Sequence, residues 1–211
     1  MIPAHEALER LRAGNRRFVS GAGRRDPGVD AALRAGSSEG QRPFAIILGC
    51  SDSRVPAEIV FDQGVGDLFV IRVAGNIVAP SQVGSVAFAA ARFGTRLVVV
   101  LGHSRCGAVV ATVEALRQPD ARPSRNLLSI VDRIRPSVEG LMGTELRRDL
   151  DALVAHAVRA NIAASVDHLR HGSEILERLI LTEGLAVVGA EYALETREVE
   201  FFDDIKGSAF A

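Results

Sequence analysis

The sequence predicts an α/β protein with an open, mostly parallel sheet of four to five strands flanked by helices, and with an extended N-terminal helix. Apolar runs of strand length alternate along the chain with segments whose apolar residues recur at helical spacing. The runs are continuous, which is typical of parallel strands covered on both faces. We expect one domain over residues 1–211, with an N-terminal helical arm (1–40) included in it.

The first half of the chain contains a predicted crossover unit. Ala4–Phe18 has apolar residues at near-helical spacing and predicts an amphipathic helix, which leads to a polar, glycine-rich connector. Between the second and third expected strands, Ser81–Phe93 is rich in alanine and predicts a close-packed crossover helix. The three strands are expected at Phe44–Leu48, Leu68–Val73 and Leu97–Leu101.

The second half is expected to add helices and two more strands. Pro119, Pro123 and Pro136 are expected to interrupt the segment after the first of these helices. Glycines at 172 and 184 mark expected helix ends. The expected helices are Ala108–Leu116, Leu146–Leu169 and Glu174–Leu181, and the expected strands are Leu185–Val188 and Glu198–Phe202.

Composition excludes several classes of protein. A content of 47% hydrophobic and 24% charged residues is ordinary for a globular protein, and a net charge of −1 gives no general attraction to nucleic acid. No apolar run reaches the roughly 18 residues of a membrane span, and the N-terminus lacks the pattern of a signal peptide. We therefore expect a cytoplasmic protein that binds neither nucleic acid nor membrane, in which a structural disulfide is improbable.

Both cysteines of the chain follow predicted strands. Cys50 and His103 fall at strand ends, and Cys106 stands three residues further on, at the start of a predicted helix. Two thiolates and an imidazole suit zinc, and three protein ligands leave a fourth position open, as in catalytic zinc sites. Asp52 and Arg54, an acid and a cation two residues apart, follow Cys50 within four positions. The alternative is that the thiols and the histidine are ordinary core residues, and that Asp52 and Arg54 form a loop salt bridge or a helix cap.

The sequence resembles the β-class carbonic anhydrases of bacterial type over nearly its whole length. The spacing of the motifs is specific, and the stretch from Gly66 to Asn76 and the N-terminal Leu11-x-x-Gly14-Asn15 add to it. The motifs that carry the resemblance are Cys50-x-Asp52-x-Arg54 and Gly102-His103-x-x-Cys106-Gly107.

The resemblance implies a carbonate dehydratase, a zinc lyase that converts carbon dioxide reversibly to bicarbonate and a proton. It implies one zinc per chain on Cys50, His103 and Cys106, with zinc-bound hydroxide as the nucleophile and the Asp52–Arg54 pair orienting it. It also implies a homodimer or a larger assembly such as a tetramer. The substrate-binding residues that we expect are Gln41, Phe69, Ala74 and Phe88, together with the Gly107 amide, which can receive the oxyanion that forms on the product.

The family divides at the fourth zinc position. One group keeps water there, whereas in the other the aspartate closes onto zinc at low pH and bicarbonate stabilises that form beside a tryptophan. Ile47 stands at the tryptophan position, and the chain contains no tryptophan. We expect the open form at neutral and alkaline pH, with Asp52 as a fourth ligand only in a closed low-pH form.

Three alternatives to carbon dioxide hydration keep the same metal ligands. One is an enzyme that hydrolyses carbon disulfide or carbonyl sulfide. Another is a bicarbonate-responsive binding protein in which Asp52 stays on zinc. The third is a purely structural zinc site, against which the intact Arg54 counts because a closed site needs no such partner.

Overall fold

The computed structural model describes residues 2–23, 40–118 and 124–202. Its five strands form one sheet in the order β2-β1-β3-β4-β5. The first four strands are parallel, and β5 pairs with β4 in the antiparallel sense. The predicted fold class is therefore confirmed, with five strands. They span Ala45–Gly49 (β1), Leu68–Arg72 (β2), Leu97–His103 (β3), Ala186–Tyr192 (β4) and Val199–Phe201 (β5).

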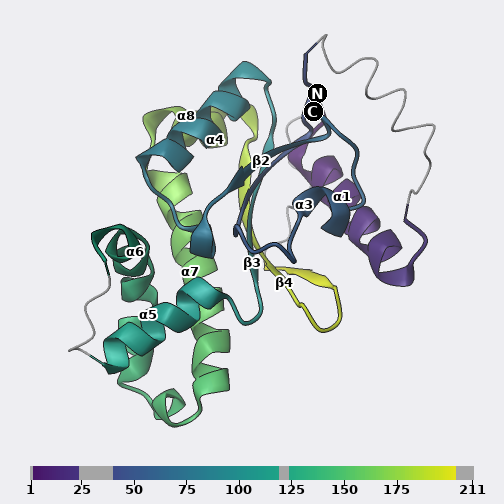
Figure 1. The fold of residues 1–211 in the computed structure, drawn as a ribbon. Helices are drawn as coiled ribbons and strands as arrows, with labels where there is room; N and C mark the ends of the chain where they lie inside the picture. Colours follow the sequence, from purple (N-terminus) through teal and green to yellow (C-terminus); the bar gives the residue numbers. More distant parts are fainter. Residues whose placement is uncertain (1, 24–39, 119–123, 203–211) are drawn as a thin grey trace.

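Helices cover both faces of this sheet (Figure 1). On one face, α1 (Ala4–Ser20) packs against β3 and against the short α3 (Ala57–Val60). On the other face, α4 and α7 pack directly on the strands. Helices α5 and α6 pack against α7 and each other, and α8 packs against α4 and α7. These helices span Pro80–Arg92 (α4), Gly107–Arg117 (α5), Arg125–Met142 (α6), Leu150–His171 (α7) and Glu174–Glu183 (α8).

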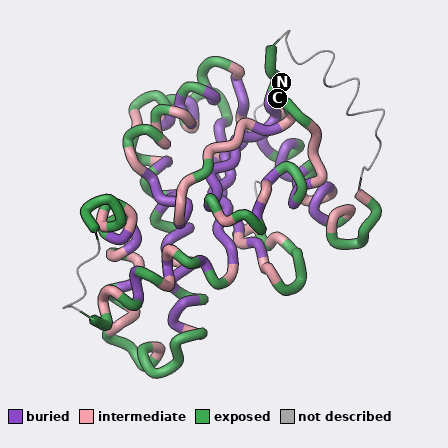
Figure 2. The backbone as a smooth tube through the Cα atoms, viewed as in Figure 1, coloured by how far each residue is buried: buried purple, intermediate pink, exposed green. Residues whose placement is uncertain are grey.

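The core lies in two layers, one on each side of the sheet, and the strands run buried through the middle of the molecule (Figure 2). Side chains alternate between the layers because successive residues of a strand point to opposite faces. Ile46 and Leu48 of β1 belong to the layer under α4 and α7, whereas Ile47 belongs to the layer under α1. All three are fully buried, and burying one such side chain contributes about 1.5–3 kcal/mol. This explains the continuous apolar runs in the sequence.

Two predictions for the helical part were wrong. Pro136 does not end a helix but lies inside α6, where the proline removes one main-chain hydrogen bond. The helix continues because Val131, Ile134 and Val138 bury one of its faces. Pro119 and Pro123 lie outside the described residues, as does most of the predicted glycine-rich connector after the N-terminal helix.

The predicted single helix Leu146–Leu169 is in fact two elements. A short 3₁₀ helix, η3 (Glu145–Arg148), precedes α7, and Asp149 separates them. The Asp149 carboxylate accepts a hydrogen bond from the main-chain amide of Ala152, which caps the N-terminus of α7. Within the described ranges, no helix combines the length and the hydropathy of a membrane span.

Candidate metal centre

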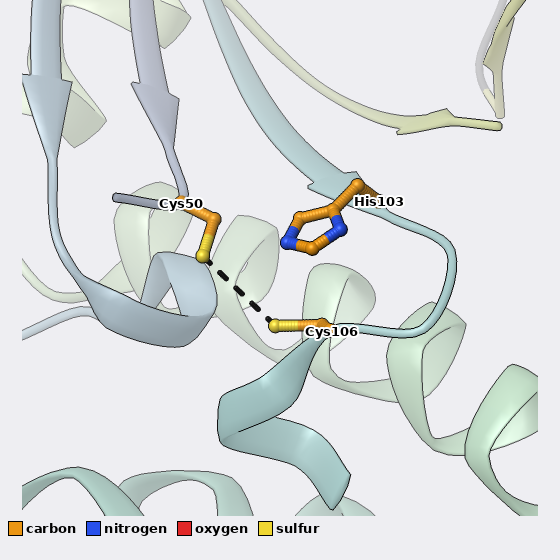
Figure 3. A group of neighbouring side chains, drawn as sticks. All are labelled: Cys50, His103 and Cys106. Carbon is orange, nitrogen blue, oxygen red and sulfur yellow. Dashed lines mark hydrogen bonds between the residues drawn. The ribbon is translucent and has the colours of Figure 1, made fainter. Parts of the chain in front are cut away.

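The three candidate ligands meet at the carboxyl edge of the sheet (Figure 3). β1 and β3 are neighbours, so Cys50, which follows β1, lies beside His103, the last residue of β3. A tight turn then leads from His103 to Cys106, which is the N-cap residue of α5. The convergence that the sequence predicts for these residues is present in the fold.

The spacing of the three side chains fits a single metal ion. Their ligand atoms all lie within 4.8 Å of one another, and the two sulfur atoms are 4.0 Å apart without a disulfide. Donors bound to one tetrahedral zinc at about 2.0–2.3 Å would lie roughly 3.5–3.8 Å from each other. All three residues are buried, with exposed fractions of 5%, 0% and 1% for Cys50, His103 and Cys106.

His103 supports the same interpretation through its two ring nitrogens. Nδ1 lies 2.9 Å from the carbonyl oxygen of Ser104, to which it can donate only when it carries the proton. Nε2 is then the lone-pair nitrogen, and it is buried without a hydrogen-bond partner among the described residues. A buried polar atom without a partner is costly, and a metal ion would satisfy it.

The pKa values of the two thiols are shifted in opposite directions. The pKa of Cys50 is lowered, chiefly because Cys106 donates a hydrogen bond to its thiolate; burial opposes this shift, and His103 and the Gly75 amide add to it. The same contact with Cys50, together with burial, raises the pKa of Cys106. One thiolate is therefore favoured by the fold itself, and a cation would stabilise the second.

Asp52 and Arg54 form a close pair next to this group. The Arg54 guanidinium donates from Nε to Asp52 Oδ1 at 2.9 Å and from Nη2 to Oδ2 at 2.7 Å. These hydrogen bonds hold the pKa of Asp52 well below its usual range. Asp52 Oδ2 also lies 3.8 Å from His103 Nε2, so an ionised carboxylate faces the ligand nitrogen.

Known proteins resemble this chain over nearly its whole length. Residues 45–199 match the family model described as carbonic anhydrase. The chain is 38% identical over 199 residues to carbonic anhydrase 2 of Mycobacterium tuberculosis, which covers 94% of this chain and 93% of the relative. It is 39% identical over 196 residues to the carbonic anhydrase of Mycolicibacterium smegmatis, with 92% and 91% covered. The solved structure of the β-carbonic anhydrase CcaA matches with a TM-score of 0.71 at 26% identity, over 93% of this chain and 95% of that chain. The chain belongs to the β-class carbonic anhydrases.

Membership makes this β-class carbonic anhydrase a carbonate dehydratase, a lyase, and confirms the resemblance read from the sequence. Enzymes of this class are metalloenzymes, and the Cys50–His103–Cys106 group of this member has the donor set, spacing and burial that a metal requires.

The expected substrate-binding residues of the carbonic anhydrase fall in two places. Ala74 directly precedes Gly75, whose amide contacts Cys50, and Gly107 is the first residue of α5, next to Cys106. Phe69 and Phe88 lie apart from these, in an aromatic cluster with Phe93.

Gln41 is not brought to the metal ligands of its own chain. It lines a cavity of about 510 Å³ together with Phe44, Phe93 and Thr95, and none of the three candidate ligands lines this cavity. Phe88 is 54% exposed although it is a large apolar residue. The Gln41 cavity and the aromatic cluster share Phe93, so both belong to one region beside β2 and α4.

Sequence reasoning missed one contact of the carbonic anhydrase site, the one between the Gly75 amide and Cys50. The 3₁₀ turn η2 (Ala74–Asn76) follows β2, and its Gly75 amide donates a hydrogen bond to Cys50 Sγ at 3.4 Å. Gly75 has a φ of 70°, a left-handed conformation that favours glycine. The glycine was visible in the sequence as a possible turn residue, but its contact with a sulfur 25 residues away was not.

Proposed function

We propose that this chain hydrates carbon dioxide reversibly at one zinc ion held by Cys50, His103 and Cys106, with Asp52 and Arg54 orienting the oxygen nucleophile. The observation that carries the proposal is the buried group of two thiols and an imidazole whose Nε2 has no hydrogen-bond partner within the described residues. Such a soft donor set suits zinc, and three protein ligands leave the fourth position open for the reaction. When bound, zinc supplies a Lewis acid that makes water acidic enough to act as a nucleophile near neutral pH.

Asp52 has a geometric role in this proposal. Its carboxylate is kept ionised by Arg54, and its Oδ2 points toward the His103 side of the site. An ionised carboxylate only accepts hydrogen bonds, so Asp52 fixes the hydrogen of the nucleophile and leaves an oxygen lone pair for the substrate. Arg54 holds Asp52 in this orientation through two charge-assisted bonds.

The substrate pocket is completed, we propose, by a second copy of the chain. Ala74 and the Gly107 amide supply the part next to the ligands, and the amide receives the oxyanion that forms on the product. Phe69, Phe88 and Gln41 line the region beside the edge strand β2. A homodimer or larger assembly would cover the exposed Phe88 and bring this region to a partner's site.

Zinc content and carbon dioxide hydration, measured on the same preparations, test the proposal. We expect about one zinc per chain, and we expect Cys50→Ser, His103→Ala and Cys106→Ser each to lose most of the metal and the activity. Full zinc occupancy in all three variants would rule out the ligand assignment. Assays with carbon disulfide and carbonyl sulfide on the wild type distinguish the alternative activities of the same site.

The orienting role of Asp52 is tested separately. We expect Asp52→Asn to retain zinc and to lose roughly 10- to 100-fold in kcat/KM, since it removes an outer partner of the site and not an essential ligand. The matched control is Asp167→Asn, at an exposed aspartate of α7, which should keep both zinc and activity. Loss of zinc together with activity in Asp52→Asn would make Asp52 a ligand.

A further inference from the structure

Two buried polar side chains on α7 donate hydrogen bonds to main-chain carbonyl groups of the turn η2. Asn161 and Ser165 are one helical turn apart and only 2% and 5% exposed. Asn161 Nδ2 donates to the carbonyl oxygen of Gly75 at 2.8 Å, and Ser165 Oγ donates to the carbonyl oxygen of Asn76 at 3.1 Å. Polar groups are retained in a core when they are hydrogen-bonded, so each of these side chains has a defined partner in the turn.

The turn has a main-chain conformation that the surrounding structure must maintain. Gly75 and Asn76 are both left-handed, with φ of 70° and 44°. A β-carbon at position 75 would lie 2.7 Å from Ile134 Cδ1 and 3.0 Å from Ala108 Cβ, so α6 and α5 close the space around the turn. Sparsely populated conformations of this kind persist where the neighbouring structure fixes them.

This conformation directs a main-chain donor at a metal ligand. The Gly75 N–H donates to Cys50 Sγ at 3.4 Å, while its carbonyl accepts from Asn161. A hydrogen bond to a sulfur ligand favours the thiolate and draws electron density from it. Groups that hydrogen-bond directly to a metal ligand, as the Gly75 amide does to Cys50, change metal affinity by about 10- to 100-fold when they are lost.

We propose that Asn161 and Ser165 are positioning residues of the metal site, which set its affinity for zinc by holding the Gly75 amide on the sulfur of Cys50. The inference rests on the proposed zinc site. It extends the metal centre from three ligands at the sheet edge to a pair of side chains on α7, more than 50 residues further along the chain than Cys106.

The competing explanation is that Asn161 and Ser165 only stabilise the fold. Asn15 provides the matched control for this. It is also buried, 6% exposed, and its amide bonds three main-chain groups, those of Val60, Arg197 and Val199. Asn15 lies on α1, against the opposite face of the sheet, so its loss affects stability without reaching η2.

Chelator competition at one fixed pH measures the zinc affinity of the full chain in each variant. We expect Asn161→Ala to weaken zinc binding by about 10-fold, the lower end of the range for a direct partner because Asn161 acts through the turn, and Ser165→Ala to weaken it by less. Ser165→Thr keeps a hydroxyl donor and should retain the wild-type affinity. In cobalt-substituted protein, the sulfur-to-cobalt charge-transfer band should shift in Asn161→Ala, because the hydrogen bond to Cys50 is lost or weakened.

Asn15→Ala should lower the melting temperature but leave both the zinc affinity and the cobalt band unchanged. Wild-type affinity and an unshifted band in both Asn161→Ala and Ser165→Ala would overturn the proposal, as would an equal loss of affinity in Asn15→Ala. If Asn161→Ala fails to fold, the zinc affinities of Ser165→Ala and Ser165→Thr test the proposal, and equal affinities in these two variants would overturn it. A wild type that binds no zinc would instead refute the proposed function, and the inference with it.

Discussion

Gly102 connects the packing of α7 on the sheet with the position of the candidate ligand His103. It precedes His103 in β3, where α7 crosses the sheet. A β-carbon at this position would lie 2.5 Å from Ile162 Cδ1 and 2.6 Å from Cγ1, closer than real side-chain contacts allow. The same isoleucine packs closely on Gly189 of β4, where a β-carbon would lie 2.9 Å from its Cγ2, so Ile162 rests on glycines of two neighbouring strands.

This geometry determines how much folding stability Gly102→Ala should lose. Overpacking a core by one methyl group costs about 1–3 kcal/mol, and a fully buried Ile162 that packs on two neighbouring strands places the substitution in the upper half of that range. For a domain of about 200 residues, 1 kcal/mol corresponds to roughly 2–4 °C. We therefore expect a melting temperature about 4–12 °C below that of the wild type, and weaker zinc binding because a shift of β3 carries His103 with it.

Calorimetry on Gly102→Ala, Ile162→Ala and the double variant tests the reasoning. Ile162→Ala alone should cost about 2–5 kcal/mol through the cavity that it leaves. The double variant should be less destabilised than the sum of the two by about 1–3 kcal/mol, since the atoms removed at 162 are those that clash. Additive effects, or a neutral Gly102→Ala, would refute the proposed clash.

Three side chains elsewhere in the chain, those of Glu191, Phe88 and Asp149, allow further tests of the fold and of the assembly. Burial raises the pKa of Glu191, and the nearby Arg159 opposes this shift only in part. Because the pKa is higher in the folded state, the protonated carboxyl stabilises the fold below the unfolded pKa of about 4.3, and this stability is lost as pH rises through the folded pKa. Glu191→Gln should thus gain stability relative to the wild type as pH rises above about 4.3 in urea unfolding, and a difference that does not vary with pH would contradict this. Phe88→Asp should give inactive monomers in sedimentation velocity, while the control Leu181→Asp, at an 82% exposed site on α8, should not; an active Phe88→Asp monomer would exclude a shared site. Asp149→Ala should cost about 0.5–2 kcal/mol through loss of the α7 cap, and Asp149→Asn much less; equal costs in chemical denaturation would count against capping.

The sheet and the convergence of Cys50, His103 and Cys106 were predictable because they depend on local signals and on the arrangement of neighbouring parallel strands. Continuous apolar runs identified four parallel strands, since these strands are buried on both faces. A crossover between β2 and β3 allows β1 and β3 to lie side by side, and the observed strand order has them as neighbours, which brings Cys50 and His103 together. The position of Cys106 followed from its distance to His103 along the chain.

What sequence reasoning missed depends on contacts between distant residues. Pro136 signals a helix end locally, but burial of one face of α6 outweighs the lost hydrogen bond. Asn161 and Ser165 look like ordinary polar residues of a helix, and only the fold shows that they bond the turn at Gly75. The roles of Gln41 and Phe88 stay predictions, because they involve a second chain.

The state of the fourth ligand position depends on how the loop after β1 is held. Arg72, the last residue of β2, donates to the carbonyl oxygens of both Cys50 and Asp52, so it fixes the main chain of this loop. Arg54 independently holds the Asp52 side chain. The pKa of Asp52 is lowered by Arg54, so the stability that this pair gives is present above the unfolded value of about 3.9 and is lost only as pH falls through the still lower folded value.

Mild acid therefore does not release Asp52 from Arg54 by itself. To become a fourth ligand, Asp52 must exchange two charge-assisted hydrogen bonds for one bond to the metal while Arg72 keeps its main chain in place. Ile47 is fully buried in β1 and offers no polar group to stabilise such a change. These contacts support the open form that we expect at neutral and alkaline pH, in which Asp52 acts on the nucleophile and not on the metal.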